Sequence, residues 1–372
     1  MKNHKIYYIT YQTFPAETAN SQQTITNIKY LVKNNSEVKL IFPLREKQSS
    51  DSIDKIKKYY NVDENFEVLG LPHNFPFGRI KFLNKTAFHI SHYLWAKKTI
   101  KNISRDSLKT DIFITRSDWV FYFLLKNNKK VLFECHQLSK LRKIIIKSCL
   151  KNQNAKIIFL NSKLRDSFKG ALSEKNNIIL HNGVDLDYFN NLTEKKKEIV
   201  FVGNLKRFNE ERNINFIIEG FIKSKLVDTY KLKIIGGPNQ VAKKIKEGIK
   251  NFSTDLNIEV TGRLKRKDAL ENIARAEIGI MINSSQNNHS LLYTSPLKYY
   301  EYLASELTII AIDFPSHRDL PYSENILFFD ENNLVKLIDC FNNAAGKERV
   351  ALDKEEISLD KRAKKILEFI EK

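Results

Sequence analysis

Residues 293–304 read YTSPLKYYEYLA and are the stretch around which the rest of the sequence can be placed. Its Thr-Ser pair can cap a helix and Pro296 suits the first helical position, so a helix is predicted to begin here. Lys298 and Glu301 fall on one face because they lie three residues apart. Backbone N–H groups and the helix dipole favour an anion at such an end, and a carboxylate one turn further in can accept hydrogen bonds from sugar hydroxyls. The stretch therefore predicts a site for a diphosphate that carries a ribose.

Two apolar segments flank this helix, residues 278–282 before it and residues 307–312 after it. A strand, a helix and a second strand in this order form a unit with parallel strands. The alternation recurs in both halves of the sequence, with further predicted strands at residues 5–10, 38–43, 110–116, 130–136, 156–160, 199–203, 232–238 and 258–264. The sequence therefore predicts an α/β fold with parallel sheets.

A chain of 372 residues can bury a large core and is expected to divide into two domains. A turn-rich passage around Asn182-Gly183 is followed by a charged, linker-like stretch, and the boundary is placed there. We expect a first domain over residues 1–190, a second over residues 191–350 and a C-terminal helical segment over residues 351–372.

Positive charge is unevenly distributed. Lysine and arginine number 62 against 43 aspartate and glutamate, and from Arg79 to Gly170 the balance is 21 against 5. A concentrated basic surface implies an anionic partner, either a membrane face or a nucleic acid. The alternative is a lysine-rich compositional bias that only solvates the surface.

A helix is predicted over residues 75–103 within this basic segment. Ile80, Leu83, Ala87, Ile90 and Leu94 recur at helical spacing on one side, and aromatic residues alternate with lysines elsewhere around it. Rings beside lysines suit a helix that lies in the interface of an anionic membrane. An ordinary amphipathic helix with an aromatic core is the other interpretation.

Several classes of protein are disfavoured. Apolar runs are too short for a spanning helix, the N-terminus does not read as a signal peptide, and three scattered cysteines fit a reducing interior, so a cytoplasmic location at the inner face of the membrane is expected. No Walker loop, G-x-G-x-x-G, G-x-S-x-G or metal-ligand spacing occurs. We therefore expect no metal or other cofactor.

Candidate site residues follow strands in both halves. Arg116, Glu134 and His136 lie at the ends of predicted strands, and ligands of parallel sheets bind beyond the carboxyl ends of strands. Glycines at 236–237 and 262 end two strands of the second half, where a missing side chain lets the backbone approach a ligand.

Five motifs in the second half together resemble glycosyltransferase family 4, which comprises retaining, metal-independent transferases with the GT-B fold. In order they are HNGVD at 181–185, FVGNL at 201–205, IIGG at 234–237, VTGRL at 260–264 and SPLKYYEYLA at 295–304. The first half matches more weakly, through FPAETAN at 14–20 and FECH at 133–136. The resemblance implies two Rossmann-like domains with parallel sheets that face an interdomain cleft, and a C-terminal helix that crosses back to the first domain.

The resemblance also implies roles for individual residues. Glu301 would bind the ribose of a nucleotide-sugar, amides near Ser295 would bind its diphosphate, Arg212 would neutralise the leaving diphosphate, and His136 would face the donor sugar. We therefore expect catalytic roles for His136, Arg212, Lys298 and Glu301. Donor contacts are expected from Gly203, Asn204, Lys206, Arg207, Gly236, Gly237, Arg263, Leu264, Tyr293, Thr294, Ser295, Pro296, Leu297 and Glu301. Acceptor-side residues are expected to be Thr18, Asn20, Ser21, Arg116 and Glu134.

Two positions depart from the family's pattern. Tyr293 stands where members commonly have a glutamate that contacts the donor sugar, so the identity of the sugar stays open. Asn204 stands where many members have a diphosphate-binding arginine, and Lys206 or Arg207 is expected to take over that contact.

The expected function is that of a membrane-associated hexosyltransferase. It would move a sugar with retention from a nucleotide diphosphate donor, expected to be UDP-linked, to a lipid, lipid-linked or cell-surface glycan acceptor in glycolipid or polysaccharide biosynthesis. The partners would be the donor, the acceptor and the anionic membrane, with no nucleic acid. The alternatives are a nucleotide-sugar epimerase of similar fold and a non-enzymatic nucleic-acid-binding protein that uses the basic segment.

Overall fold

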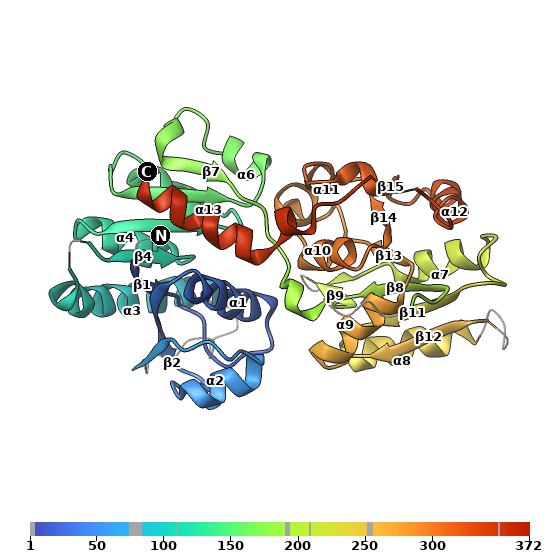
Figure 1. Ribbon diagram of the computed structural model, residues 1–372, viewed down its shortest axis with the longest axis horizontal. Helices are drawn as coiled ribbons and strands as arrows, with labels where there is room; N and C mark the ends of the chain where they lie inside the picture. The colour runs from blue at the N-terminus through green and yellow to red at the C-terminus, as the bar shows by residue number, and fades with distance from the viewer. Residues whose placement is uncertain are drawn as a thin grey trace. The chain divides into compact units, whose positions relative to one another are not determined.

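The computed structural model describes residues 4–73, 84–108, 110–189, 194–207, 210–250, 256–348 and 350–372 (Figure 1). The chain forms two compact units, Met1–Leu180 with Leu359–Lys372, and His181–Ser358. Within the described residues, no helix combines the length and the apolar character needed to cross a bilayer.

The first unit is built on a seven-stranded sheet in which every pair of neighbours is parallel, in the order β3-β2-β1-β4-β5-β6-β7. Long apolar runs explain why the central strands are buried on both faces. The strands are β1 (His4–Ile9), β2 (Ser36–Leu44), β3 (Glu67–Pro72), β4 (Ile112–Thr115), β5 (Lys130–Cys135), β6 (Ala155–Phe159) and β7 (Asn177–Ile179).

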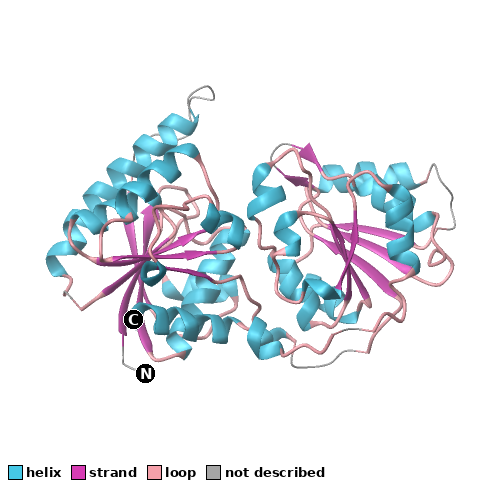
Figure 2. Ribbon diagram, turned by 90° about the horizontal axis from the view of Figure 1, so that it is seen from above, coloured by secondary structure: helices cyan, strands magenta, loops and turns pink. Residues whose placement is uncertain are grey.

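Helices cover both faces of this sheet (Figure 2). One face shares a hydrophobic core with α1 (Ala19–Lys33), α2 (Ile53–Tyr60) and α13 (Leu359–Glu371). On the other face, α4 (Asp118–Lys126) packs against β4 and β5, and α3 (Asn84–Asp106) and α5 (Lys140–Cys149) pack against α4. A short helix, α6 (Ser162–Asp166), follows β6. The first unit is thus a three-layer Rossmann-like domain.

The second unit repeats this plan with six parallel strands in the order β12-β11-β8-β13-β14-β15. The strands are β8 (Glu198–Val202), β11 (Lys231–Ile235), β12 (Ile258–Gly262), β13 (Ile278–Met281), β14 (Thr308–Ile312) and β15 (Ile326–Phe329). A small antiparallel hairpin, β9 (Lys206–Arg207) with β10 (Glu210–Glu211), follows β8.

Two helical layers again enclose the sheet (Figure 2). The helices α7 (Ile214–Ile222), α8 (Asn239–Ile249) and α12 (Leu334–Asn342) pack into the core on one face. The other face packs against α9 (Arg266–Arg275) and α10 (Leu297–Ala304), and a four-residue helix, α11 (Pro315–Arg318), follows β14.

The predicted fold class is confirmed, since both sheets are parallel and both are covered by helices on two faces. The C-terminal helix α13 belongs to the first unit, where it packs against α1. The structure divides the chain at Leu180 and His181, ten residues before the expected boundary. Val184 explains the difference, because it pairs with Ser358 and so joins residues 181–189 to the second unit.

The start of α10 differs from the sequence prediction. Pro296 is the N-cap rather than the first helical residue, and no side chain caps the helix. The Ser295 hydroxyl instead lies 3.0 Å from the hydroxyl of Tyr300. A single π-helical turn, His289–Tyr293, leads into this start. The Ser-Pro sequence therefore marks where α10 begins, as predicted. Ser295 contacts Tyr300 in the second turn of the helix instead of capping its first turn.

The helix predicted over residues 75–103 also differs. The structure describes α3 from Asn84 to Asp106, and Ile80 and Leu83 lie outside the described residues. Ile90 and Leu94 are 48% and 45% exposed, whereas Trp95 on the opposite side is buried. The apolar stripe therefore faces outward along its described part.

Tyr302 anchors α10 to the sheet. It is completely buried, and its hydroxyl accepts a hydrogen bond from the amide of Val202 at 3.2 Å. Its ring fills the space beside Gly279 on β13, where an added Cβ would lie 2.5 Å from the ring. A glycine at this position is thus needed for α10 to approach the end of β8.

We predict that Gly279→Ala destabilises the protein by about 1–3 kcal/mol, because the buried ring of Tyr302 has no room to move away from a methyl group. Gly248→Ala is the matched control, since no atom lies within 4 Å of an added Cβ in that part of α8. The control should be neutral or more stable by about 0.5–1 kcal/mol. Urea unfolding of both variants measures the effect, and equal midpoints would contradict the packing argument.

Candidate functional site

The carboxyl edge of the second sheet is where the predicted donor-binding residues gather. The amide of Gly203, after β8, donates to the carbonyl of Ile235, and Gly236, after β11, donates to the carbonyl of Gly262. An added Cβ on Gly236 would lie 1.8 Å from the carbonyl oxygen of Gly203. These glycines let three strand ends approach each other closely, and they leave backbone rather than side chains at the edge of the sheet.

Two cations converge on this edge. The Lys298 Nζ lies 4.5 Å from the centre of the Phe201 ring, and the Arg212 guanidinium lies 5.8 Å from it. An added Cβ on Gly203 would be 3.7 Å from the lysine Nζ and 3.9 Å from Arg212 Nη1. Arg212 also donates to the carbonyl of Ile282 after β13, at 2.8 Å. The arrangement brings two positive charges beside an open stretch of backbone, which suits a diphosphate.

Glu301 occupies the next turn of α10. Its side chain is 4% exposed and forms an ion pair with Arg266, the first residue of α9, whose side chain is 47% exposed. Burial acts to lower the pKa of Arg266, but the Glu301 carboxylate together with Tyr188 and Asp185 more than offsets this effect, so the pKa is raised. A buried carboxylate with a half-exposed cation beside it is suited to accept hydrogen bonds from a ligand.

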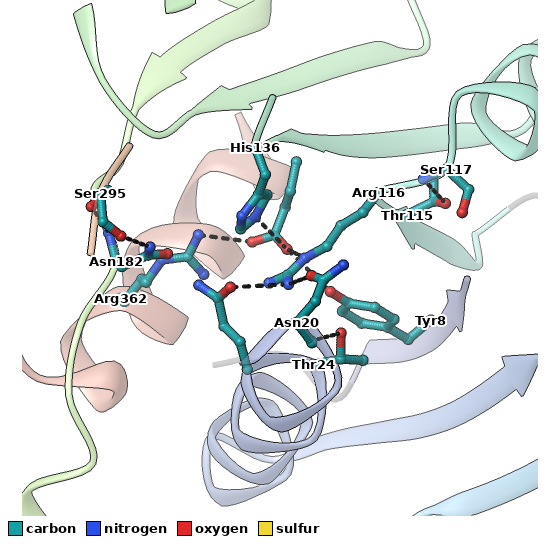
Figure 3. A network of polar contacts seen from close by, with 12 residues as sticks. Tyr8, Asn20, Thr24, Thr115, Arg116, Ser117, His136, Asn182, Ser295 and Arg362 are labelled. Carbon is teal, nitrogen blue, oxygen red and sulfur yellow. Dashed lines mark hydrogen bonds and ion pairs between the residues drawn. The ribbon is translucent and has the colours of Figure 1, made fainter. Parts of the chain in front are cut away.

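The loop that carries Asn182 is fastened to the start of α10. The Asn182 side-chain amide donates to the carbonyl of Ser295 at 2.6 Å, and its backbone amide donates to the Ser295 hydroxyl at 3.4 Å (Figure 3). Gly183 has no space for a side chain, because an added Cβ would lie 2.8 Å from the carbonyl oxygen of Ile357. The HNGVD motif thus supports the strand-to-helix connection from within the second unit.

The remaining predicted donor residues lie in the segments that follow the strands of this sheet, and several of them are exposed. Arg263 Nη2 donates to the Asn204 side chain at 3.4 Å, and both residues are exposed. Lys206 is exposed on the β9–β10 hairpin, and the side chain of Arg207 lies outside the described residues. Half-buried positions are held by Leu264, Tyr293, Pro296 and Leu297, and Thr294 is buried. Gly237 lies beside Arg263, whose Nε would be 3.1 Å from an added Cβ.

The carboxyl edge of the first sheet holds a buried polar network that includes Tyr8, Arg116 and Arg362 (Figure 3). Glu134 is the partner that these three side chains share. Its carboxylate accepts from Arg116 Nε at 2.7 Å, Arg362 Nη2 at 2.8 Å and the Tyr8 hydroxyl at 3.1 Å. Burial alone would raise the pKa of Glu134, and the two guanidinium groups hold it well below its usual range. Glu134 is therefore held in its charged form at the centre of this network.

His136 follows β5 directly, and its Nε2 lies 3.8 Å from Glu134 Oε2. Burial and the charge of Arg116 lower its pKa to about 3, despite the nearby carboxylate. The imidazole is consequently neutral at physiological pH, so it can exchange hydrogen bonds with a sugar but cannot supply a positive charge.

The predicted acceptor-side residues divide into two groups. Asn20 accepts from Arg116 Nη1 at 2.9 Å and so joins the Glu134 network. Thr18 and Ser21 instead shape the start of α1, since Thr18 accepts from the amide of Ser21 and the Ser21 hydroxyl donates to the carbonyl of Ala16. The structure thus gives Thr18 and Ser21 a local backbone role.

Four residues that lie beside the predicted site residues were not identified from the sequence. Arg266, Arg362 and Tyr8 are described above, and His317 is a buried histidine whose pKa burial lowers to about 4, with further lowering by the charges of Lys298 and Arg212. The only available signal for Arg266 was its place four residues after the Thr-Gly turn of β12. The described residues contain no group of three or more histidine, cysteine, aspartate or glutamate side chains placed to hold a metal ion.

Part of the second unit is similar to a known protein family. Residues 196–344 match the family model described as "Glycosyl transferases group 1". This match covers less than half of the chain and lies within the second unit. A search of curated proteins finds no match.

Solved structures similar to the whole chain include a sucrose-phosphate synthase from Thermosynechococcus elongatus, at 13% identity and a TM-score of 0.65, with 99% of this chain and 94% of that chain covered. A lipopolysaccharide outer core galactosyltransferase matches at 13% identity and a TM-score of 0.57, with 98% and 97% covered. A UDP-GlcNAc 2-epimerase from Methanocaldococcus jannaschii matches at 11% identity and a TM-score of 0.63, with 99% of each chain covered.

At these identities the similarities show the fold alone. Two Rossmann-like domains with parallel sheets, found in this chain and in its structural neighbours, make up the GT-B fold. The chain therefore has the GT-B fold, with a region similar to the glycosyl transferases group 1 model in its second unit.

Proposed function

We propose that this protein is a retaining glycosyltransferase that takes a sugar from a nucleotide diphosphate donor. The observation that carries the proposal is the convergence of Lys298, Arg212 and Glu301 on one edge of the second sheet, inside the region that matches the group 1 model. The expected donor is UDP-linked, and the expected transfer is of a hexose. One similar structure acts on a UDP-linked sugar by its title, which is compatible with this donor class.

The proposed chemistry follows from charge. When the bond between the anomeric carbon and the diphosphate oxygen breaks, negative charge accumulates on the leaving group. Lys298 and Arg212 stabilise that charge more in the transition state than in the ground state, and we propose that they do so without a metal ion. The acceptor hydroxyl attacks the same face of the sugar and passes its proton to a leaving phosphate oxygen. Neutral His136 would contact the donor sugar.

We expect Glu301→Ala to weaken UDP binding at least about tenfold, because a hydrogen bond to a charged group contributes about 1.5–3 kcal/mol. Isothermal titration calorimetry measures the affinity. Glu271→Ala, an exposed carboxylate on α9, is the matched control and should bind UDP normally. Near-normal affinity in the Glu301 variant would remove this residue from the donor site.

A nucleotide-sugar epimerase is the second candidate, since the epimerase from Methanocaldococcus jannaschii has the same fold over the whole chain. Incubation with UDP-sugars separates the two. A transferase should leave the donor sugar unchanged until an acceptor is present, apart from slow hydrolysis, and nuclear magnetic resonance of the nucleotide-sugar detects any isomer. An isomerised sugar nucleotide formed without acceptor would decide for the epimerase.

For the acceptor we propose a lipid or lipid-linked molecule at the inner face of an anionic membrane. The support is the surface of α3, α4 and α5 in the first unit, which we call the basic helical face. Exposed apolar residues on it are Ile90, Leu94 and Ile144, and Ile144 is 67% exposed. Exposed lysines on the same helices are Lys97, Lys98, Lys101, Lys126, Lys140 and Lys147.

Aromatic side chains connect two of these helices. Tyr93 on α3 meets the Trp119 ring on α4 edge to face at 5.0 Å between ring centres, and Tyr122 lies 6.1 Å from Trp119. All three rings are half-buried. Rings at headgroup depth, apolar side chains beyond them and lysines around them are what binding to an anionic membrane surface requires.

We predict that Ile144→Glu lowers binding to phosphatidylglycerol-containing vesicles about tenfold at about 0.15 M salt, since it removes an inserting side chain and adds a repelled charge. Vesicle co-sedimentation measures the binding. Val335→Glu is the matched control, because Val335 is 70% exposed on α12 of the second unit. Equal binding by both variants, or a preference of the unaltered protein for oligonucleotides over vesicles, would contradict the membrane proposal.

A further inference from the structure

The ion pair between Arg266 and Glu301 joins the two helices that cover one face of the second sheet. Arg266 is the first residue of α9, and Glu301 lies in the second turn of α10. The guanidinium binds Glu301 Oε1, and among the described residues no hydrogen bond reaches Oε2. One oxygen of the buried carboxylate is thus held, and the other is left for a ligand.

The surroundings of Arg266 are acidic. Besides Glu301, Asp185 and the Tyr188 hydroxyl act on its charge, and its side chain is 47% exposed. Neighbouring Lys265 and Lys267 are exposed and have no ion pair within the described part of the chain. Arg266 is therefore the basic residue of this segment that turns toward the site, and its remaining N–H groups stay within reach of a bound molecule.

We propose that Arg266 is a positioning residue that makes the site selective for ribonucleotides. The proposal rests on the proposed function, because it assigns Glu301 to the ribose of the donor. Arg266 holds the Glu301 carboxylate so that Oε2 accepts a hydrogen bond from one ribose hydroxyl, while a second guanidinium N–H donates to the neighbouring hydroxyl oxygen.

The ion pair places a hydrogen-bond acceptor, the Glu301 carboxylate, beside a hydrogen-bond donor, the Arg266 guanidinium. A vicinal diol offers one O–H to a carboxylate and one lone pair to a guanidinium, so the pair recognises both hydroxyls at once. A carboxylate without its guanidinium can still accept from both hydroxyls through its two oxygens, but it keeps rotational freedom and offers no donor to either hydroxyl. Lysine at this position would supply charge, but not the planar fork that fixes the carboxylate.

The test compares UDP with 2′-deoxy-UDP and 3′-deoxy-UDP by calorimetry on the full chain. We expect the unaltered protein to bind UDP about ten- to a hundredfold more tightly than at least one deoxy analogue. In Arg266→Met this ratio should fall to within about threefold of unity, and Arg266→Lys should restore part of it. Lys267→Met removes a neighbouring exposed charge and should leave the ratio unchanged.

Three results would overturn the inference. An unchanged ratio in Arg266→Met, with affinity for UDP and its analogues lowered equally, would mean that Arg266 only supports the fold or the local charge. Tighter UDP binding in that variant would mean that Arg266 competes with the ribose. Failure of the unaltered protein to bind UDP at all would overturn the proposed donor itself, which distinguishes that failure from the other two.

Discussion

Parallel pairing of the strands is the constraint on which the rest of this structure depends. Every strand of a parallel sheet ends at the same edge, so the residues that follow each strand are gathered there whatever their separation in the chain. In the second unit this edge collects Gly203, Gly236 and the start of α10. In the first unit it collects Arg116, Glu134 and His136. Helices on both faces bury the sheets, so the residues at this edge are the ones that parallel pairing brings together for a ligand.

Charge at both edges is compensated by arginine, in two different ways. Glu134 is enclosed by two guanidinium groups and a tyrosine, so breaking one contact would leave a buried charge, at a cost of about 3–5 kcal/mol. One of those arginines, Arg362, comes from the C-terminal helix and binds it to the first unit. Within the part of the chain that the structure describes, Glu301 pairs with one arginine, Arg266, whose side chain is half-exposed, and this makes Glu301 the more accessible carboxylate of the two.

The apolar stripe of α3 shows that residue spacing can predict a helix without predicting whether its apolar side is buried or exposed. Ile90 and Leu94 repeat at a spacing that fits either a core or a surface-binding helix. Burial of Ser91, His92 and Trp95 on the opposite side decides that the stripe faces outward. The tertiary structure supplies that information, because His92 and Trp95 pack against the Tyr11 ring and Ser91 lies 2.6 Å from the Tyr11 hydroxyl. Elsewhere on α3, Tyr93 packs against Trp119 of α4.

By itself the sequence predicted the α/β class and most of the strands in both halves, because apolar runs and Gly turns are local signals. The resemblance of its motifs to glycosyltransferase family 4 pointed to Lys298, Arg212 and Glu301 as site residues. Tertiary structure alone decided which charges meet. Arg266 and Glu301 are 35 residues apart and Arg362 and Glu134 are 228 residues apart, so no local pattern links them. It also decided that residues 181–189 join the second unit, since Val184 pairs with the distant Ser358.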